Sequence, residues 1–425
     1  MNSRTPTAPC VLLVVAAMIA SGCASPHIDA PRDLTPPPAP TSAIDAEAAA
    51  ARAVAVSAKV HAAGRRLEAA SARAHARSLP PDPSIAIGLG IPIDGLGGSP
   101  ASVSIMEGLS WLLSGERQQR AAEGECDAAA AELVAIAAGV AAEARRLVRT
   151  LDAARARRDA LARSAAARSE LAEIEQAALA EGESTAARVA ALVGESAESR
   201  MELASAALAV QETEVALMSL LALESQPAVA PFGDVAPATD ATLSLDVLRA
   251  RARVARAEAE VDLGRTPLGA DPQIGVGISR DLEDRRSVDG TIELTVPLFR
   301  RAKEQMAREQ DLAAEHAELA ELERIAAVEL AHARAAVDDA RAQRAEALEA
   351  VAASERARAA VERALEAGEA SRAELLRASA ERDEWRARAA ARSIAFAEAL
   401  ARIESRSTAA TAASHEAAAL MERTR

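Results

Sequence analysis

The stretch of sequence that decides the fold is Asp82-Pro83-Ser84-Ile85-Ala86-Ile87-Gly88-Leu89-Gly90, which recurs as Asp271-Pro272-Gln273-Ile274-Gly275-Val276-Gly277-Ile278-Ser279. In both copies an aliphatic residue alternates with a small one, and a period of two is typical of a strand with one apolar face. The pattern predicts strands over about 84–93 and 273–280, each followed by a second strand, over about 102–113 and 288–298. Because the whole hairpin recurs in the second half of the sequence, the chain is a tandem duplication of one unit.

Long helices rich in Ala, Glu and Arg are predicted around both hairpins. The longest cover 116–180 and 301–365, and each spans about 100 Å at a rise of 1.5 Å per residue. A glycine follows both of them, Gly182 with Ser184 behind it and Gly368 with Ser371 behind it. The fold class is therefore mainly α with β-hairpins, in a long coiled-coil arrangement. Shorter helices are expected over 45–78, 184–223, 243–263 and 371–419.

The amino terminus indicates secretion and lipidation. The apolar run from Val11 to Ile19 is too short to span a bilayer and suits the core of a signal peptide, residues 1–22. It ends at Ala20-Ser21-Gly22-Cys23, which resembles a bacterial lipobox, in which the cysteine becomes the lipidated first residue. An ordinary secretory signal with an incidental cysteine is the alternative.

Proline-rich segments divide the rest of the chain. Residues 23–44 predict an extended tether between the lipid and the folded part, and residues 226–242 a linker between the repeats. The first repeat then covers 45–225 and the second 243–425. Each is predicted to form helices and a hairpin, with the helical turns near 182 and 368.

Composition excludes several classes of function. The 425 residues carry a net charge of −14 with 1% aromatic residues, so no basic surface with stacking partners is available for nucleic acid. The six histidines are scattered without paired spacing, and no phosphate-binding glycine loop occurs, so neither a metal site nor a cofactor is expected. No catalytic constellation is evident. An enzyme is the least favoured class.

The strands predict a surface in contact with lipid. Segments of about ten residues with aliphatic residues on one side and small or polar residues on the other are typical of a transmembrane barrel with a wet lumen. A soluble sandwich, which also alternates, is the alternative. Because four strands per chain are too few to close a barrel, closure needs strands from other copies.

At this point the chain resembles the outer-membrane efflux proteins of the TolC type, the outer membrane factor lipoproteins. The motifs are the duplicated hairpins, the Val296-Pro297-Leu298-Phe299 ending, and the turn from Gly368 to Ser371 followed by Glu374-Leu375-Leu376. The resemblance implies a homotrimer with a twelve-stranded barrel in the bacterial outer membrane and a periplasmic helical barrel. It also implies partners, a periplasmic adaptor and an inner-membrane transporter. The implied function is the channel of a tripartite efflux or type I secretion system.

The sequence departs from that family in three places. In the family, the helix after the central linker usually begins with an Arg-Pro-Asp-Leu-like turn. This chain has Leu248-Arg249-Ala250 instead, so the sequence does not fix the residue at which that helix begins. Glu107 falls in the lipid-facing row of Ile105 and Leu109, where a charge is costly at mid-membrane and cheaper near the interface. Aromatic girdles are almost absent, with Trp111 and Phe299 as the nearby candidates.

Two alternatives to a channel remain open. A periplasmic adaptor is also a lipoprotein with a coiled-coil hairpin, but adaptors carry one hairpin flanked by β-domains and this chain carries two. A structural coiled-coil envelope lipoprotein would not need the alternating strands.

The helical turns hold the candidate gate residues. In the family an acidic residue commonly lies six positions after the turn glycine and helps to constrict the entrance. Glu374 matches this position, whereas the equivalent position in the first repeat is Arg188. The alternative role for Glu374 is a capping box with Ser371. Both roles are compatible.

Overall fold

In the computed structural model the described residues are 43–79, 84–89, 101–108, 110–233, 244–265, 273–280, 286–293 and 301–406. They fall into two compact units, and the two longest helices, α4 (Ser110–Ala180) and α7 (Arg301–Glu366), each contribute to both. Among the described residues, the first unit takes 61–135 and 245–325 and the second 43–60, 136–244 and 326–406.

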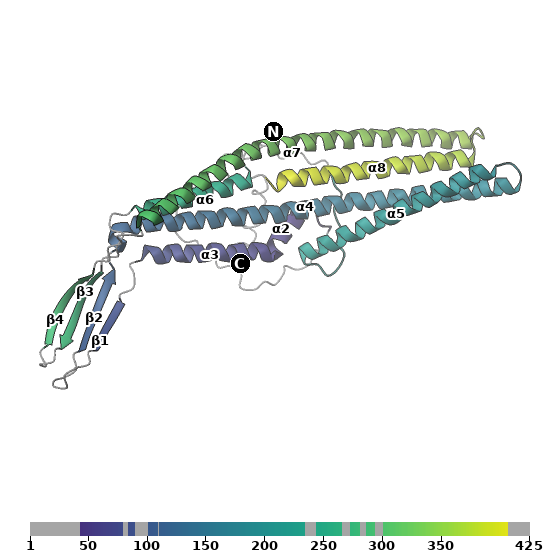
Figure 1. Cartoon of the computed structure of the whole chain (residues 1–425). Coiled ribbons are helices and arrows are strands. Elements are labelled where there is room, and N and C mark those ends of the chain that lie inside the picture. Colours follow the sequence, from purple (N-terminus) through teal and green to yellow (C-terminus); the bar gives the residue numbers. More distant parts are fainter. Residues whose placement is uncertain are drawn as a thin grey trace, which may run out of the picture. The chain divides into compact units, whose positions relative to one another are not determined.

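The helices follow the predicted plan closely. The bounds are α2 Ala46–Val56, α3 Ala58–Ser78, α4 Ser110–Ala180, α5 Ala186–Leu221, α6 Leu245–Gly264, α7 Arg301–Glu366 and α8 Arg372–Glu404 (Figure 1). The single helix predicted over 45–78 is two helices, because Ser57 between them is extended, with ψ 115°. Asp45 caps α2 by accepting a hydrogen bond of 2.7 Å from the Ala48 N–H. The last helix ends at Glu404, and the remaining positions of its predicted range from 407 onward lie outside the described residues.

One predicted strand is wrong over its second half. The strand expected over 102–113 is β2 Ala101–Gly108, and α4 begins at Ser110. The alternation stops at Gly108, and the apolar run Trp111-Leu112-Leu113 has no period of two, whereas leucine is a good helix former. Trp111 therefore lies in the first turn of α4 and is no longer a candidate for an aromatic girdle on a strand.

The other strands agree with the prediction where they are described. They are β1 Ser84–Leu89, β3 Gln273–Arg280 and β4 Arg286–Glu293. β4 begins slightly before its predicted start. The predicted ends over 90–93 and 294–298, and Phe299, lie outside the described residues.

The four strands form one antiparallel sheet in the order β1-β2-β3-β4 (Figure 1). The two hairpins of the two repeats thus join through β2 and β3, where Val103 lies opposite Ile278 and Ile105 opposite Val276. The sheet belongs to the first unit. Its two edges are β1 and β4.

The helices of the first unit pack through small residues. A cluster of Ala70, Ala74, Ala122 and Cys126 joins α3 to α4. Gly124 permits a close crossing with α6, because a Cβ at this position would lie 2.9 Å from the Cα of Arg256. Alanine and glycine thus allow close helix packing without large side chains.

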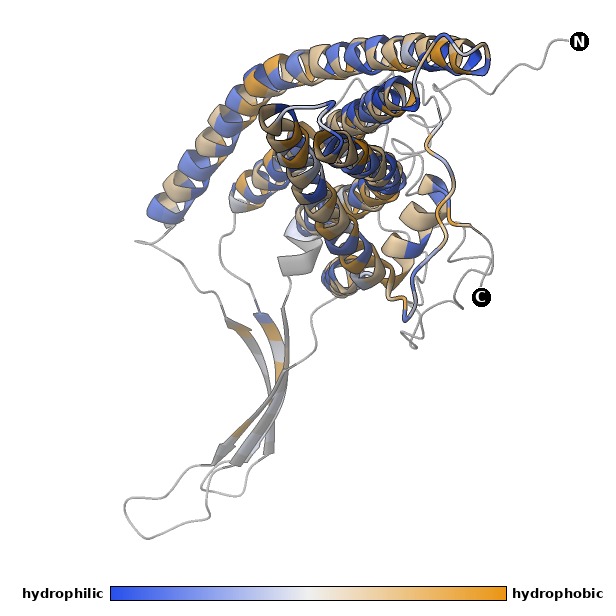
Figure 2. Cartoon of the chain, turned by 90° about the vertical axis from the view of Figure 1, so that its right-hand side faces the viewer, coloured by the Kyte–Doolittle hydropathy of each residue, from blue (hydrophilic) through white to orange (hydrophobic). Residues whose placement is uncertain are grey.

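The helices of the second unit form a layer in the order α5, α4, α8, α7 (Figure 1). Ion pairs follow this order: Arg155 of α4 binds Glu214 of α5, and Arg386 of α8 binds Glu355 of α7. Apolar and polar residues are interleaved along the helices, as Figure 2 shows, so that each helix buries a stripe. The edges of this layer are α5 and α7.

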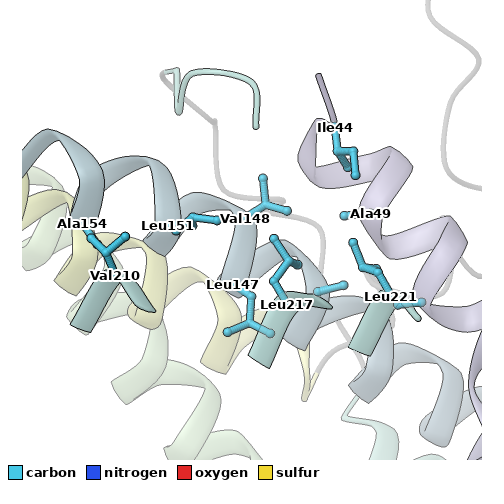
Figure 3. Packing of buried hydrophobic residues seen from close by; sticks show 11 residues of the cluster. Ile44, Ala49, Leu147, Val148, Leu151, Ala154, Val210, Leu217 and Leu221 are labelled. Atoms are coloured by element: carbon cyan, nitrogen blue, oxygen red, sulfur yellow. The ribbon is translucent and has the colours of Figure 1, made fainter. Parts of the chain in front are cut away.

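Among the described residues of this unit, a large apolar cluster lies where α2, α4 and α5 meet (Figure 3). Leu151, Leu217 and Leu221 are fully buried there. The helices are held mainly by such leucine and valine contacts, since each buried large aliphatic side chain contributes about 1.5–3 kcal/mol. The members are Ile44, Ala49, Ala53, Ala144, Leu147, Val148, Leu151, Ala154, Val210, Leu217 and Leu221.

Candidate functional site

One face of the sheet is aliphatic across all four strands. Residues paired directly across strands lie on the same face, so the pairings define continuous rows. One row runs through Ile87, Val103, Ile278 and Val288. Val288 is 75% exposed, and Ile87, Val276 and Ile292 are also exposed. An exposed aliphatic surface of this kind requires a cover other than water.

The opposite face carries small and polar residues. One row runs through Gly88, Ser102, Ser279 and Ser287, and the hydroxyls of Ser279 and Ser287 lie 2.6 Å apart. A Cβ at Gly88 would lie 2.5 Å from the Ser102 hydroxyl, so this face has little room for side chains between β1 and β2. The predicted alternation of aliphatic and small residues is confirmed for these strands.

Glu107 falls in the aliphatic row, where it pairs with Ile274. It is the last residue but one of β2, which ends at Gly108, and α4 begins at Ser110. Glu107 therefore lies at the helical end of the aliphatic face and away from its middle. A charge there costs much less in a lipid environment than one at the centre.

The edges of the sheet are complementary in direction. Each strand runs antiparallel to the next, so β1 and β4 run in opposite directions. The free edge of β4 can therefore continue the antiparallel pattern with the free edge of β1 in another copy. This continuation is open to any number of copies in a closed ring.

The two helical turns are built identically. Gly182 and Gly368 have φ of +82° and +75°, in the left-handed region that glycine adopts without strain. The N–H of the residue after each glycine bonds the carbonyl five positions back, from Glu183 to Ala178 and from Glu369 to Ala364, both at 2.8 Å. This is the Schellman motif, which satisfies the last carbonyls of α4 and α7.

A hydroxyl three positions after each glycine starts the next helix. Ser371 accepts from the Glu374 N–H, and the Glu374 carboxylate accepts from the Ser371 N–H at 2.7 Å, so the predicted capping box is present. Its equivalent in the first repeat is Thr185, which accepts from the Arg188 N–H. The hydrogen bond from the Ser371 backbone holds the pKa of Glu374 below its ordinary value.

Glu175 organises the first turn. Its carboxylate accepts a hydrogen bond of 2.6 Å from the Ser184 hydroxyl and lies 2.8 Å from the Nε of Arg188. The Glu175 side chain is 9% exposed. Ser184 thus stabilises the turn through its bond to Glu175, and Thr185 caps α5. Sequence reasoning missed both Glu175 and Thr185, although the spacing from Gly368 to Ser371 matches that from Gly182 to Thr185.

Ion pairs join the two helical hairpins of the second unit. Asp383 of α8 is 2% exposed and lies 3.3 Å from Arg163 of α4, with Arg382 and Arg386 also in contact. Arg168 of α4 binds Glu384, and Arg372 at the start of α8 binds Glu170. The most buried of these carboxylates thus has three arginines around it.

The structure gives Arg188 and Glu374 separate partners within one chain. Arg188 binds Glu175 and Glu374 caps α8, and among the described residues the two form no ion pair with each other. Cys23 lies outside the described residues. In the part of the chain that is described, no group of three or more His, Cys, Asp or Glu residues is arranged to hold a metal ion.

The chain has the fold of outer-membrane channels of known structure. The CmeC outer membrane channel of Campylobacter jejuni matches with a TM-score of 0.68 over 87% of this chain and 85% of its own, at 13% identity. A membrane protein from Pseudomonas aeruginosa gives 0.69 over 85% and 92% of the two chains, at 19% identity. The open state of the MtrE outer membrane channel of Neisseria gonorrhoeae gives 0.59 over 85% and 88%, at 15% identity. Neither a protein-family model nor a curated protein sequence matches the chain.

Proposed function

We propose that this chain, which has the fold of outer-membrane channels, is the outer-membrane channel of a tripartite efflux or type I secretion system. The channel is a homotrimer that passes substrates from an inner-membrane pump and a periplasmic adaptor to the exterior. The observation that carries the proposal is the sheet, since an exposed aliphatic face lies on strands whose other face is small and polar. Lipid on one side and water on the other account for both faces.

The strand count supports three copies. Eight strands, the number in two copies, enclose a space that side chains fill, whereas larger barrels leave an aqueous channel. Three copies bring twelve strands, because each chain adds four in an unbroken antiparallel order. Closure also removes the exposed edges of β1 and β4, which would otherwise invite uncontrolled pairing.

The strand length is compatible with a thin membrane. β3 and β4 have eight residues each, which measure about 27 Å along the strand at 3.4 Å per residue and about 20 Å along a barrel axis at the usual tilt. The aliphatic band of an outer-membrane barrel is about 25 Å tall. A lipid on Cys23, joined by the tether over 23–44, adds a second attachment to the same membrane.

The helices extend into the periplasm in this proposal. The turns with Gly182, Ser184, Gly368 and Ser371 form the entrance and meet the adaptor, and Arg188 and Glu374 lie beside it as gate residues. An adaptor function is not favoured. The reason is that the hairpins of both repeats merge into one sheet, whereas an adaptor has a single helical hairpin between separate β-domains.

The orientation can be tested with single cysteines. Asp94→Cys, between β1 and β2, is expected to react in intact cells with a membrane-impermeant thiol reagent, and Glu183→Cys, beside the turn, only after the outer membrane is permeabilised. The detergent-extracted protein is expected to have the mass of a trimer. A monomer, or labelling with the reverse order of accessibility, contradicts the proposal.

A further inference from the structure

The segment after α5 contacts all four helices of the layer in the second unit. We call residues 222–233 the strap; it begins directly after the last residue of α5. Near its start the Gln226 amide donates a hydrogen bond of 2.7 Å to Glu214 of α5. At its far end the Phe232 N–H donates one of 2.8 Å to Asp152 of α4. The strap is thus bound to both helices of one hairpin.

Phe232 joins the strap to the other hairpin, α7 and α8. Its ring stacks on Phe396 of α8, with the ring centroids 5.9 Å apart. The guanidinium carbon of Arg344 of α7 lies 5.2 Å from the Phe232 centroid and 5.6 Å from the Phe396 centroid. Aromatic residues make up 1% of the chain, yet two of its three phenylalanines meet here. Stacked rings with a cation over their faces attract each other, so this contact connects the strap to both α7 and α8.

The middle of the strap is held by backbone hydrogen bonds to the residue before the cap of α2. The Ile44 N–H donates to the Ala228 carbonyl at 2.8 Å, and the Ile44 carbonyl accepts from the Ala230 N–H at 2.9 Å. Ile44 is buried in the apolar cluster of Figure 3, so these bonds tie the strap to that cluster. Backbone hydrogen bonds and apolar contacts do not depend on ionised side chains.

Ion pairs beside the strap are more buried than those near the turns. The Arg149–Glu404 pair, whose arginine lies over the Phe232 ring, has side chains 4% and 16% exposed. Toward the turns, the arginines that join α4 to α8 are 51% exposed at Arg163 and 73% exposed at Arg372. The Debye length falls from about 30 Å at 0.01 M salt to about 3 Å at 1 M, and buried pairs are screened much less than exposed ones. Salt therefore weakens the contacts near the turns most.

We propose that the strap keeps the two hairpins joined at high ionic strength, so that they separate at the turns and not beside Phe232. The bend then falls between Phe396 and Asp383, which lie about 20 Å apart along α8. This property belongs to the single chain. Its consequence for the channel, a helical wall that stays closed beside the strap, rests on the proposed function.

Distances between spin labels test the strap directly. In a Cys126→Ala background, Glu183→Cys/Glu369→Cys places one label beside each turn, and Glu212→Cys/Ala342→Cys places labels on exposed positions of α5 and α7 near the strap. The full-length chain is coexpressed with an excess of unlabelled chain, so that pulsed electron paramagnetic resonance measures distances within one chain. From about 0.01 M to about 1 M salt, the turn distance is expected to lengthen by more than its low-salt distribution width, and the strap distance to stay within its own.

Two variants release the strap by different routes. Phe232→Ala removes the stacked ring, and Asp152→Ala removes the acceptor of the Phe232 N–H. Each is expected to lengthen the strap distance at high salt. The double variant should lengthen it less than the sum of the two, because both act through one segment. The matched control is Leu161→Ala, which removes a buried side chain from the cluster that joins α4, α5 and α8 and leaves the strap distance as in the wild type.

A strap distance that lengthens with salt in the wild type overturns this inference, and so does a turn distance that salt leaves unchanged. Unchanged strap distances in both Phe232→Ala and Asp152→Ala overturn it as well. The channel proposal is decided separately, by the mass of the extracted protein and by cysteine labelling in intact cells, so that either can fail while the other stands.

Discussion

Gly182 and Gly368 hold the two helical turns in a backbone conformation that other residues adopt only with strain. Both have positive φ, and a Cβ at either position meets nothing within 4 Å, so the cost of a side chain is conformational and not steric crowding by neighbours. The identical hydrogen bonds around them explain why the same residue recurs in both repeats.

Replacing a turn glycine should lower stability by a defined amount. Gly368→Ala is expected to reduce the free energy of unfolding by about 1 kcal/mol, because alanine is strained at positive φ. Gly139→Ala, inside α4 where a Cβ also meets nothing within 4 Å, is the matched control and should be neutral or stabilising by up to about 1 kcal/mol. Thermal unfolding followed by circular dichroism measures both. An equal effect of the two changes contradicts the turn assignment.

The proposed gate depends on two single residues, Arg188 and Glu374. Arg188→Glu is expected to raise single-channel conductance in planar bilayers, because it loses the bond to Glu175 and adds like charge at the entrance. Glu374→Arg in the same chain should partly reverse the increase. Glu175→Gln is the control that loosens Arg188 without reversing its charge. Unchanged conductance in Arg188→Glu and in Glu374→Arg would leave Glu374 with its capping role alone.

At the scale of elements, the sheet and the helix layer depend on different forces. The sheet exposes an aliphatic face, whereas the second unit has ion pairs between α4 and α8, among them one to the buried Asp383. Each force predicts where a charge is tolerated.

A charge in the middle of the aliphatic face should prevent insertion. Val276→Arg is expected to cost about 2–4 kcal/mol, the penalty for arginine at the centre of a membrane barrel, and to lower the amount of trimer in the outer membrane. Ser287→Arg, on the small and polar face, is the control and should insert. Immunoblots of membrane fractions compare the two. Normal insertion of Val276→Arg contradicts a lipid-facing role for this face.

The joint between α4 and α8 should depend on Asp383. Its removal leaves Arg382, Arg386 and Arg163 without their shared carboxylate. Asp383→Asn is expected to cost about 1.5–3 kcal/mol, the range for hydrogen bonds to charged groups, because Arg163 and Arg386 are partly exposed and remain solvated. Asp159→Asn, which removes an exposed partner of Arg158, should cost no more than about 1 kcal/mol. Denaturant unfolding measures the difference, and similar costs for both changes would show that Asp383 is not essential to the joint.

At the scale of the whole molecule, the proposed trimer has two kinds of membrane attachment in each chain. In that proposal the sheet supplies one and the lipid on Cys23 the other. Cys23→Ser is expected to abolish labelling by a radioactive fatty acid while the extracted protein remains a trimer, because closure depends on the strands and not on the lipid. Retained labelling contradicts the lipobox assignment. Loss of the trimer would show that assembly requires the anchor.

The sequence by itself determined the features that depend on local backbone periodicity. The alternation of Ile274, Val276 and Ile278 predicts β3 with its bounds, and the glycines predict both turns, since period and φ are set within a few residues. The long helices follow in the same way from uninterrupted helix-forming residues. The capping box of Ser371 and Glu374 is local as well, and the structure confirms it.

Only the tertiary structure decided which distant residues meet. With 49 basic and 63 acidic residues in the chain, charge pattern alone does not select Glu175 as the partner of Arg188, or Asp383 as the residue that three arginines surround. The junction of β2 with β3 is likewise a pairing across the duplication, and α4 begins at Ser110 where strand alternation gives way to a run of good helix formers. Such choices depend on complementarity between whole surfaces, which periodicity along the chain does not encode.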